Sequence, residues 1–292
     1  MNSHHSYRTF SRPFVRTGVS TGSIMYDVIL ALLPAAGVGV WRFGIHAFLI
    51  LLSAVVSAVG LECTLNAILG RANSLRDGSA AVTGLLLGLS LPPDVPVYIP
   101  MIGAAAAVLV VKGIEGLGKN RLNPALGGRC LLTVAFGGVM TAYLKGSGTS
   151  AALATADPVR FLLGTSGAVI GSSVIALAAG GLWLTAVGVL HWQIPVFSLG
   201  SFMVFTLLFG SDDPAWGQIL FFLSCGGMLS LVFMASDPVT GPITKNGKLL
   251  FGGIVGLLSV LLGNVLAPAE AACCAVLMTN LAAPLIEKLT IR

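Results

Sequence analysis

Residues 44–69 read GIHAFLILLSAVVSAVGLECTLNAIL, and the single charged residue in this run is Glu62. The run is longer than the roughly 20 apolar residues that a helix needs to cross a bilayer. Directly before it, residues 24–41 form a second apolar run whose only charged residue is Asp27. Two such runs in succession predict membrane-spanning helices rather than the core helices of a water-soluble protein.

The composition of the whole chain supports this prediction. Of 292 residues, 55% are hydrophobic and only 9% are charged, whereas about 25% are charged in an average soluble domain. The mean hydropathy is +0.93, and 37 glycines suit the close approach of membrane helices. A water-soluble fold is therefore excluded, and the predicted class is an all-α polytopic membrane protein.

Apolar runs between polar, Gly and Pro clusters predict about ten transmembrane helices in all. They lie near 24–41, 44–69, 79–91, 95–111, 125–144, 165–190, 194–209, 216–235, 249–265 and 269–287. The third run ends before Pro92 and Pro93 and is too short to cross 30 Å, so we expect a half-helix. Glycines interrupt the sixth run, which predicts a broken or tightly packed helix.

The distribution of Lys and Arg predicts the orientation, because cytoplasmic loops carry the excess of cations. With the N-terminus inside, the outer segments hold only Arg42, Lys145 and Arg160, and Arg129 falls just within the fifth span. The inner segments hold the other cations: Arg8, Arg12, Arg16, Arg71, Arg76, Lys112, Lys119, Arg121, Lys245, Lys248, Lys288 and Arg292. We therefore expect a multi-pass inner-membrane protein with both termini cytoplasmic and no signal peptide. The net charge of +5 does not indicate nucleic-acid binding, because the cations are dispersed over short loops. Their role in orienting the chain in the bilayer is the better explanation.

The five cysteines give no sign of a metal centre or a disulfide framework. They show no CxxC spacing and lie in or beside apolar runs. We expect them to be small packing residues; they are Cys63, Cys130, Cys225, Cys273 and Cys274.

Two polar stretches could carry chemistry. Residues 116–129, GLGKNRLNPALGGR, combine glycines, cations, Asn120 and Asn123 beside a helix start. Such a segment can present backbone N–H groups and positive charge to a phosphate, and both asparagines are candidate cofactor contacts. The alternative is a tight loop in which Asn123 caps the fifth helix and Pro124 occupies its first turn. In the second stretch, SDPVTGPITKNG at 236–247, Asp237 before a proline predicts a helix end and a turn.

Two further carboxylates need an explanation. Asp77 opens the short third run and is expected to cap it. Glu62 lies inside the second apolar run, where a carboxylate is costly and marks an ion path or a paired contact, or reaches the headgroups.

The chain divides into an N-terminal segment, 1–23, a first half, 24–144, an outer loop, 145–160, and a second half, 161–292. The loop sequence KGSGTSAALATADP at 145–158 is typical of a flexible linker. The stretches DGSAAVTGLLLGL, from residue 77, and GTSGAVIGSSVIAL, from residue 164, indicate an internal repeat or share only their composition.

The chain resembles the NqrB/RnfD family, which comprises the D subunit of the membrane-bound Rnf ferredoxin:NAD oxidoreductase and the B subunit of the sodium-pumping NADH:quinone reductase. The stretches that carry the resemblance are STGSIMYDVILALLPA from residue 20, DGSAAVTGLLLGLSLPP from 77, GLGKNRLNPALGGR from 116, DPVTGPITKNG from 237 and LMTNLAAPLIEKLT from 277. The resemblance implies ten helices in two five-helix halves, related in fold to urea and ammonium channels. It also implies Na⁺ or H⁺ translocation coupled to electron transfer, with the A, B, C, E and G subunits as partners.

The resemblance further implies FMN joined through its phosphate to a threonine of an outward-facing Ser/Thr-Gly-Ala-Thr type motif. The best ungapped match places Ala152 at the attachment position, and alanine has no hydroxyl for a phosphoester. Thr149, Ser150 or, with a gap, Thr155 could take the phosphoester instead, or the protein holds flavin loosely or not at all. The rival function is a stand-alone channel or transporter for a small neutral solute, because one architecture serves both. No span offers an oxygen cage that selects Na⁺ over H⁺.

Overall fold

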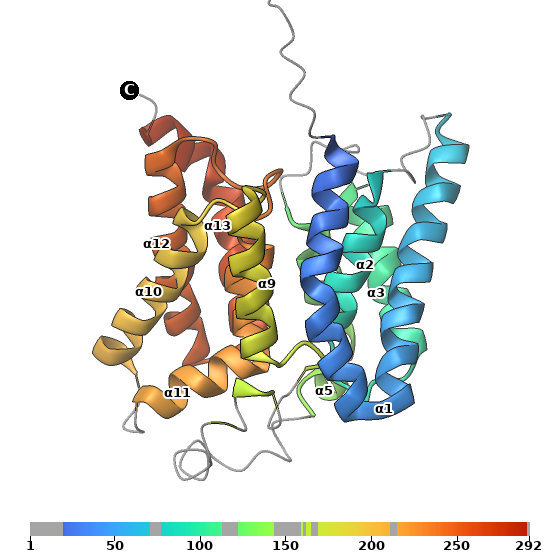
Figure 1. Cartoon of the computed structure of the whole chain (residues 1–292), viewed down its shortest axis with the longest axis horizontal. Coiled ribbons are helices and arrows are strands. Elements are labelled where there is room, and N and C mark those ends of the chain that lie inside the picture. Colours follow the sequence, from blue (N-terminus) through green and yellow to red (C-terminus); the bar gives the residue numbers. More distant parts are fainter. Residues whose placement is uncertain are drawn as a thin grey trace, which may run out of the picture.

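The computed structural model describes residues 20–70, 77–112, 122–142, 159, 162–164, 169–210 and 215–290. The regular elements within these ranges are α-helices and short π-helices. They form two groups that lie beside each other (Figure 1). We call α1, α2, α3, η2 and α5 the N-terminal bundle, and α9 to α13 with η3 and η4 the C-terminal bundle.

Helix α1 (Thr21–Ile68) contains both apolar runs with which the chain begins. Gly44 adopts φ 72° and ψ −158° inside it, a left-handed conformation that glycine reaches without steric cost. The chain reverses there, so that two helical segments of α1 lie side by side (Figure 1). The two predicted spans are therefore two helices joined by a single-residue kink.

Helix α2 (Ser79–Leu89) has 11 residues and cannot cross a bilayer at 1.5 Å per residue. The predicted half-helix is confirmed. After the Pro92–Pro93 turn, α3 (Tyr98–Ala105) continues into the π-helix η2 (Ala106–Lys112), and α5 (Pro124–Met140) completes the bundle. Gly84 of α2 lies against Ala54 of α1, where an added Cβ would be 2.7 Å from a carbonyl oxygen, so the helices pack at backbone distance.

The C-terminal bundle contains α9 (Val174–Val187), α10 (Gln193–Phe209), α12 (Lys245–Gly263) and α13 (Pro268–Thr290). Between α10 and α12, α11 (Ala215–Phe222) leads into η3 (Leu223–Gly227) and η4 (Leu229–Met234). The sequence predicted a span over 216–235, and the helical segments agree with it, but Cys225 and Gly226, at φ 102°, leave the helical conformation within it. The break falls at Gly226 because glycine tolerates a backbone that other residues rarely adopt.

The sixth predicted run, 165–190, is helical only from Val174 onward in the described residues. Gly180 and Gly181 lie inside α9 and do not interrupt it. A Cβ on Gly181 would approach Val232 within 2.8 Å, so this glycine permits close packing. Of the two predicted alternatives for these two glycines, tight packing is the correct one.

The two bundles meet at the segments that precede α9 and follow α2. The Ile170 amide donates to the Leu91 carbonyl at 3.0 Å, and the Gly171 amide donates to the Leu89 carbonyl at 2.8 Å. Helix α9 also packs against α1. The two hydrogen bonds give partners to backbone groups at the end of the short helix α2 and in the segment before α9.

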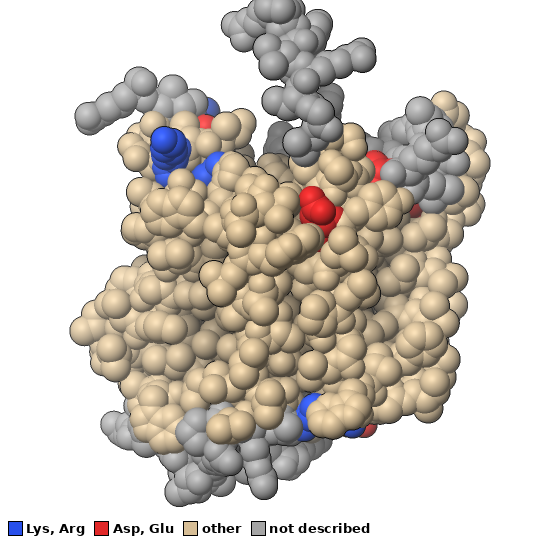
Figure 2. Space-filling view, viewed as in Figure 1, with Lys and Arg blue, Asp and Glu red and all other residues tan. Residues whose placement is uncertain are grey.

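Within the part of the chain that the structure describes, three helices, α1, α12 and α13, are long and apolar enough to span a membrane, and several shorter apolar helices accompany them. In the space-filling view, charged residues lie toward the two ends of the visible face and the broad middle is free of them (Figure 2). Both observations support a polytopic membrane protein. The count of ten spans stays a prediction.

We call the end of the molecule at which α1 begins and α13 ends the terminal face. The Thr244 and Thr290 hydroxyls lie 2.7 Å apart there, which places the start of α12 beside the end of α13. The starts of α2 and α5 meet the turn after η4 at a cavity that opens on the same face. The terminal face therefore gathers segments from both bundles.

Candidate functional site

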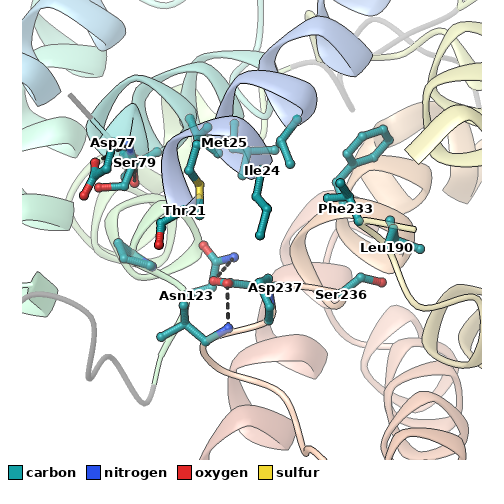
Figure 3. A pocket seen from close by; sticks show the side chains of 18 of the residues that line it. Thr21, Ile24, Met25, Asp77, Ser79, Asn123, Leu190, Phe233, Ser236 and Asp237 are labelled. Atoms are coloured by element: carbon teal, nitrogen blue, oxygen red, sulfur yellow. Dashed lines mark hydrogen bonds between the residues drawn. The ribbon is translucent and has the colours of Figure 1, made fainter. Parts of the chain in front are cut away.

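A cavity of about 270 Å³ opens between the two bundles at the terminal face. Its wall is built by helix ends: the beginnings of α1, α2 and α5, and the ends of η2, α9 and η4. Figure 3 shows Thr21, Asn123 and Asp237 around it. The volume lies close to the lower end of the roughly 300–1,000 Å³ typical of small-molecule pockets.

Local hydrogen bonds mark the points where three helices begin at this cavity, and two of these helices, α1 and α5, carry a side-chain cap. The Ser20 hydroxyl accepts from the Ser23 amide at 3.1 Å and caps α1. The Asp77 carboxylate accepts from the Ser79 amide at 2.9 Å just before α2. The predicted cap by Asp77 was wrong, because Gly78 in the left-handed conformation is the N-cap of α2 and no side chain caps that helix. The Asn123 side-chain oxygen accepts from the amides of the first turn of α5, at 3.0 and 3.4 Å, and Pro124 occupies the first helical position. The predicted cap by Asn123 is confirmed.

Asn123 also joins the two bundles. Its Nδ2 donates to the Met234 carbonyl at 3.2 Å and to Asp237 Oδ2 at 3.4 Å. An amide nitrogen has two hydrogens, so both donors of Asn123 are occupied. Asn123 therefore lines the cavity and positions Asp237, while its own polar atoms already have protein partners.

Asp237 follows η4 in a turn, as the sequence predicted. Its Oδ1 accepts from the Val239 amide at 3.1 Å. Burial raises the pKa of the Asp237 carboxyl, while the Val239 hydrogen bond and the positive charge of Lys112 oppose that rise. The carboxylate is therefore held in a site that disfavours its charged form.

A buried polar network lies beside the cavity within the N-terminal bundle. Lys112 Nζ pairs with Glu62 Oε2 at 2.7 Å. The Ser79 hydroxyl lies 3.3 Å from Lys112 Nζ and donates to Glu62 Oε1 at 3.5 Å. Lys112 and Ser79 line the cavity. Of the alternatives that the sequence left open for Glu62, the paired contact is correct, since its exposure is 0%.

The remaining wall of the cavity is mainly apolar. One polar exception is the Ser236 hydroxyl, a buried oxygen that has no hydrogen-bond partner among the described residues. A buried hydroxyl at a cavity wall suits a ligand that offers a polar atom. The apolar residues around it are Ile24, Met25, Val28, Val82, Leu86, Leu184, Val189, Leu190 and Phe233.

A second cavity, of about 470 Å³, adjoins the first and shares Ser236 and Asp237 with it. Its lining is more polar and includes Asp27 and His191. Burial lowers the pKa of the His191 imidazole, and the charge of Lys248 lowers it further. Asp237 thus lies between a mainly apolar cavity and a more polar one.

A second buried ion pair connects the bundles away from these cavities. Arg129 Nη2 of α5 pairs with Glu270 Oε1 of α13 at 2.9 Å. Arg129 is 1% exposed, and its Nε and Nη1 atoms have no hydrogen-bond partner among the described residues. The sequence placed Arg129 just inside a span but did not predict its partner.

Several candidate residues lie outside the described residues: Asn120, Thr149, Ser150, Ala152 and Thr155. Sequence reasoning missed Lys112 and Ser236 as cavity residues. Lys112 was counted only as a loop cation, although a carboxylate in an apolar run calls for a buried cation. No sequence signal distinguishes Ser236 from other serines. Within the described ranges, His, Cys, Asp and Glu form no group that could hold a metal ion.

Comparison with known proteins gives one family over nearly the whole chain. Residues 8–292 match the NQR2, RnfD, RnfE family. The chain is 36% identical to the D subunit of the proton-translocating ferredoxin:NAD(+) oxidoreductase complex of Clostridium ljungdahlii, over 96% of this chain and 93% of the relative. It is 34% identical to the D subunit of the Na(+)-translocating ferredoxin:NAD(+) oxidoreductase complex of Acetobacterium woodii, over 96% and 92%. It is 32% identical to the D subunit of the ion-translocating oxidoreductase complex of Aeromonas salmonicida, over 96% of both chains.

Proposed function

The chain belongs to the NQR2, RnfD, RnfE family, and from this premise we propose that it is the D subunit of an Rnf-type complex in the cell membrane. The complex would couple electron transfer between ferredoxin and NAD to the translocation of Na⁺ or H⁺. The nearly full-length similarity to relatives named as D subunits of such complexes carries this proposal. The A, B, C, E and G subunits of the complex would be its partners, and the chain would not be catalytic alone.

Deletion of the coding sequence tests this assignment. Membranes from the deletion strain are expected to lose ferredoxin:NAD oxidoreductase activity, and the chain supplied on a plasmid should restore it. A stand-alone channel for a neutral solute would leave that activity at its original level and would change solute uptake instead.

The proposed cofactor is a flavin, which supplies one- and two-electron redox chemistry when bound. The cavity at the terminal face fits the ring of such a group on two grounds. Its apolar side chains, among them Met25 and Phe233, can pack against a flat aromatic system, and the buried Ser236 hydroxyl is available to a polar ring atom. Lys112, paired with Glu62, lies at the same wall.

A bulky substitution tests the cavity. Met25→Trp is expected to fill it and to lower the amount of flavin that acid precipitation releases from the purified complex. Leu33→Trp is the matched control, because Leu33 lies in the same helix and is 50% exposed. Retention of acid-released flavin in Met25→Trp, at the level of the control, would remove the cavity from the proposal.

The covalent FMN is proposed for a hydroxyl of the outer loop, where Ala152 departs from the family pattern. Thr149 or Ser150 is preferred over Thr155, because Thr155 lies close to Asp157, and Pro158 restricts the backbone of that residue. Denatured protein should fluoresce in a gel and carry one FMN-sized mass on a peptide from residues 145–160. Replacing Thr149 and Ser150 together by Ala should abolish the fluorescence. Fluorescence that survives would move the attachment to Thr155.

We further infer that the terminal face is cytoplasmic, from the excess of cations on that side of the predicted topology. Single cysteines at positions 149 and 245, in a cysteine-depleted background, test this on intact cells with a membrane-impermeant thiol reagent. Labelling is expected at 149 and not at 245; the reverse pattern would overturn the orientation.

A further inference from the structure

The second cavity, of about 470 Å³, has charged groups of both signs in its lining. Asp27 of α1 lines it from the N-terminal bundle, whereas His191, between α9 and α10, and Lys248 of α12 line it from the C-terminal bundle. Within the described residues, the ion pairs that Lys and Arg form with carboxylates are those of Lys112 and Arg129. Asp27 and Lys248 therefore line one cavity without forming an ion pair with each other.

The other carboxylates near this cavity already accept hydrogen bonds from the protein. Asp237 accepts from the Val239 amide at 3.1 Å and from Asn123 Nδ2 at 3.4 Å. Glu287, the acidic neighbour of Lys248, accepts from the Ile243 amide at 2.9 Å. Among the described residues, no side-chain hydrogen bond occupies Asp27 or the Lys248 ammonium. A ligand therefore finds a free acceptor at Asp27 and a free donor at Lys248.

The position of the cavity points to a lipid as this ligand. Helices α1 and α12, which begin beside it, are long and apolar enough to span a membrane. Two apolar residues of its lining are strongly exposed, Val187 at 50% and Ile243 at 82%. Trp192, which follows His191, is 52% exposed, and tryptophan is enriched where a membrane meets water. The cavity thus combines a charged interior with an apolar rim at the level of the headgroups.

We propose that this cavity binds the zwitterionic headgroup of phosphatidylethanolamine, a phospholipid with a primary ammonium group. The lipid ammonium donates to Asp27, and the lipid phosphate accepts from Lys248 and His191. Burial and the charge of Lys248 lower the pKa of His191, so its neutral imidazole donates through one ring nitrogen. This inference depends on the membrane location of the chain and not on the proposed electron-transfer function.

The same charges discriminate against other phospholipids. Phosphatidylglycerol has a phosphate for Lys248 but no cation for Asp27, and its negative charge would be repelled by that carboxylate. Phosphatidylcholine has the net charge of phosphatidylethanolamine, but its quaternary ammonium has no N–H to donate. It therefore loses the charge-assisted hydrogen bond to Asp27. Because Asp27, His191 and Lys248 do not line the first cavity, the lipid site is separate from the proposed flavin site.

Lipid retention by the native complex tests the proposal. The purified complex is stripped of lipid with detergent and incubated with an equal mixture of phosphatidylethanolamine, phosphatidylcholine and phosphatidylglycerol of the same acyl chains. Mass spectrometry then measures the lipid retained after gel filtration, and phosphatidylethanolamine should predominate. Equal retention of all the lipids, or a preference for phosphatidylglycerol, would overturn the proposal. Glycerophosphoethanolamine, the headgroup without acyl chains, should not displace the lipid at equal concentration; displacement would contradict a lipid as the occupant.

Variants assign the retained lipid to this cavity. Asp27→Asn and Lys248→Met should each weaken the retention of phosphatidylethanolamine by about tenfold, the effect of losing one charge-assisted hydrogen bond. Asp27→Asn should also retain more phosphatidylglycerol than the parent, because the cavity loses its free carboxylate. Lys245→Met is the matched control, since Lys245 is exposed on the same helix as Lys248 and does not line the cavity.

Phosphatidylethanolamine retained at the control level in both Asp27→Asn and Lys248→Met would contradict the assignment. A merely structural role of Asp27 would lower the retention of every lipid and would not change the preference among them. The preference of the unaltered complex decides the question if a variant fails to assemble.

Discussion

The two buried ion pairs of this protein differ in what they join and in how completely they are satisfied. Lys112 and Glu62 lie within the N-terminal bundle, and the Ser79 hydroxyl contacts both. Arg129 and Glu270 join the two bundles, and two guanidinium nitrogens of Arg129 have no partner among the described residues. The first pair is a local polar network that shapes the cavity wall. The second depends on assembly of the bundles and leaves more of its charge uncompensated.

The largest expected effect follows from breaking the pair between the bundles. Arg129→Met leaves Glu270 buried without its cation, which typically costs about 3–5 kcal/mol of stability. The double variant Arg129→Met with Glu270→Met removes both charges and should recover most of that loss. The midpoint of detergent-induced unfolding measures the effect. A double variant as unstable as the single one would contradict the electrostatic explanation.

Breaking the pair beside the cavity should have a smaller effect. Lys112→Met removes the cation, but Glu62 keeps the Ser79 hydroxyl as a donor. We expect a loss of about 1–3 kcal/mol, the range for a buried polar group that loses one partner. Lys245→Met, at an exposed position on the terminal face, is the control and should be neutral. If Lys112→Met lowered the stability more than Arg129→Met does, the comparison between the two ion pairs would be reversed.

A still smaller effect is expected where Asn123 caps α5 and contacts the C-terminal bundle. Asn123→Ala removes the cap and the two hydrogen bonds to Met234 and Asp237, and should cost about 1–2 kcal/mol in all. Asn123→Ser restores a cap but not the amide donors, so its unfolding midpoint should fall between those of Asn123→Ala and the parent. Equal midpoints for the two variants would show that the cap contributes nothing measurable.

The smallest effect concerns pH. Burial raises the pKa of Asp237 in the folded protein above its value of 3.8 in the unfolded chain. The folded state then binds more protons between the two pKa values, so this group lowers stability as pH rises through that window. Asp237→Asn cannot ionise, and its stability relative to the parent should increase as pH rises from about 4. A stability difference between the two proteins that does not change with pH would contradict the burial of a charged carboxylate.

The sequence predicted much of the fold because membrane helices have a strong local signal. The half-helix before Pro92 and the cap at Asn123 depend on short stretches of residues, and the structure agrees with both. The break at Gly226 was missed, since glycine occurs throughout membrane helices and only tertiary packing selects which glycines inside a helix adopt a positive φ.

The candidate site was predictable only where its residues lie close in sequence. Asn123 and Asp237 each stood in a polar stretch, but their hydrogen bond joins residues 114 positions apart. Likewise, a paired contact was only one of the alternatives that the sequence left open for Glu62, and nothing in the sequence indicated Lys112 as the partner. Pairings over such separations arise from the packing of the two bundles, which no single stretch of the sequence encodes.

Isolation of the chain with its partners tests the assigned function most directly. An affinity tag at the C-terminus, used on membranes solubilised in mild detergent, should recover flavin- and iron–sulfur-containing proteins together with ferredoxin:NAD oxidoreductase activity. The tagged Arg129→Met and Glu270→Met double variant should recover the same proteins if it folds as expected. Recovery of the unaltered chain alone, without flavin and with conductance for a small neutral solute in liposomes, would contradict the assignment.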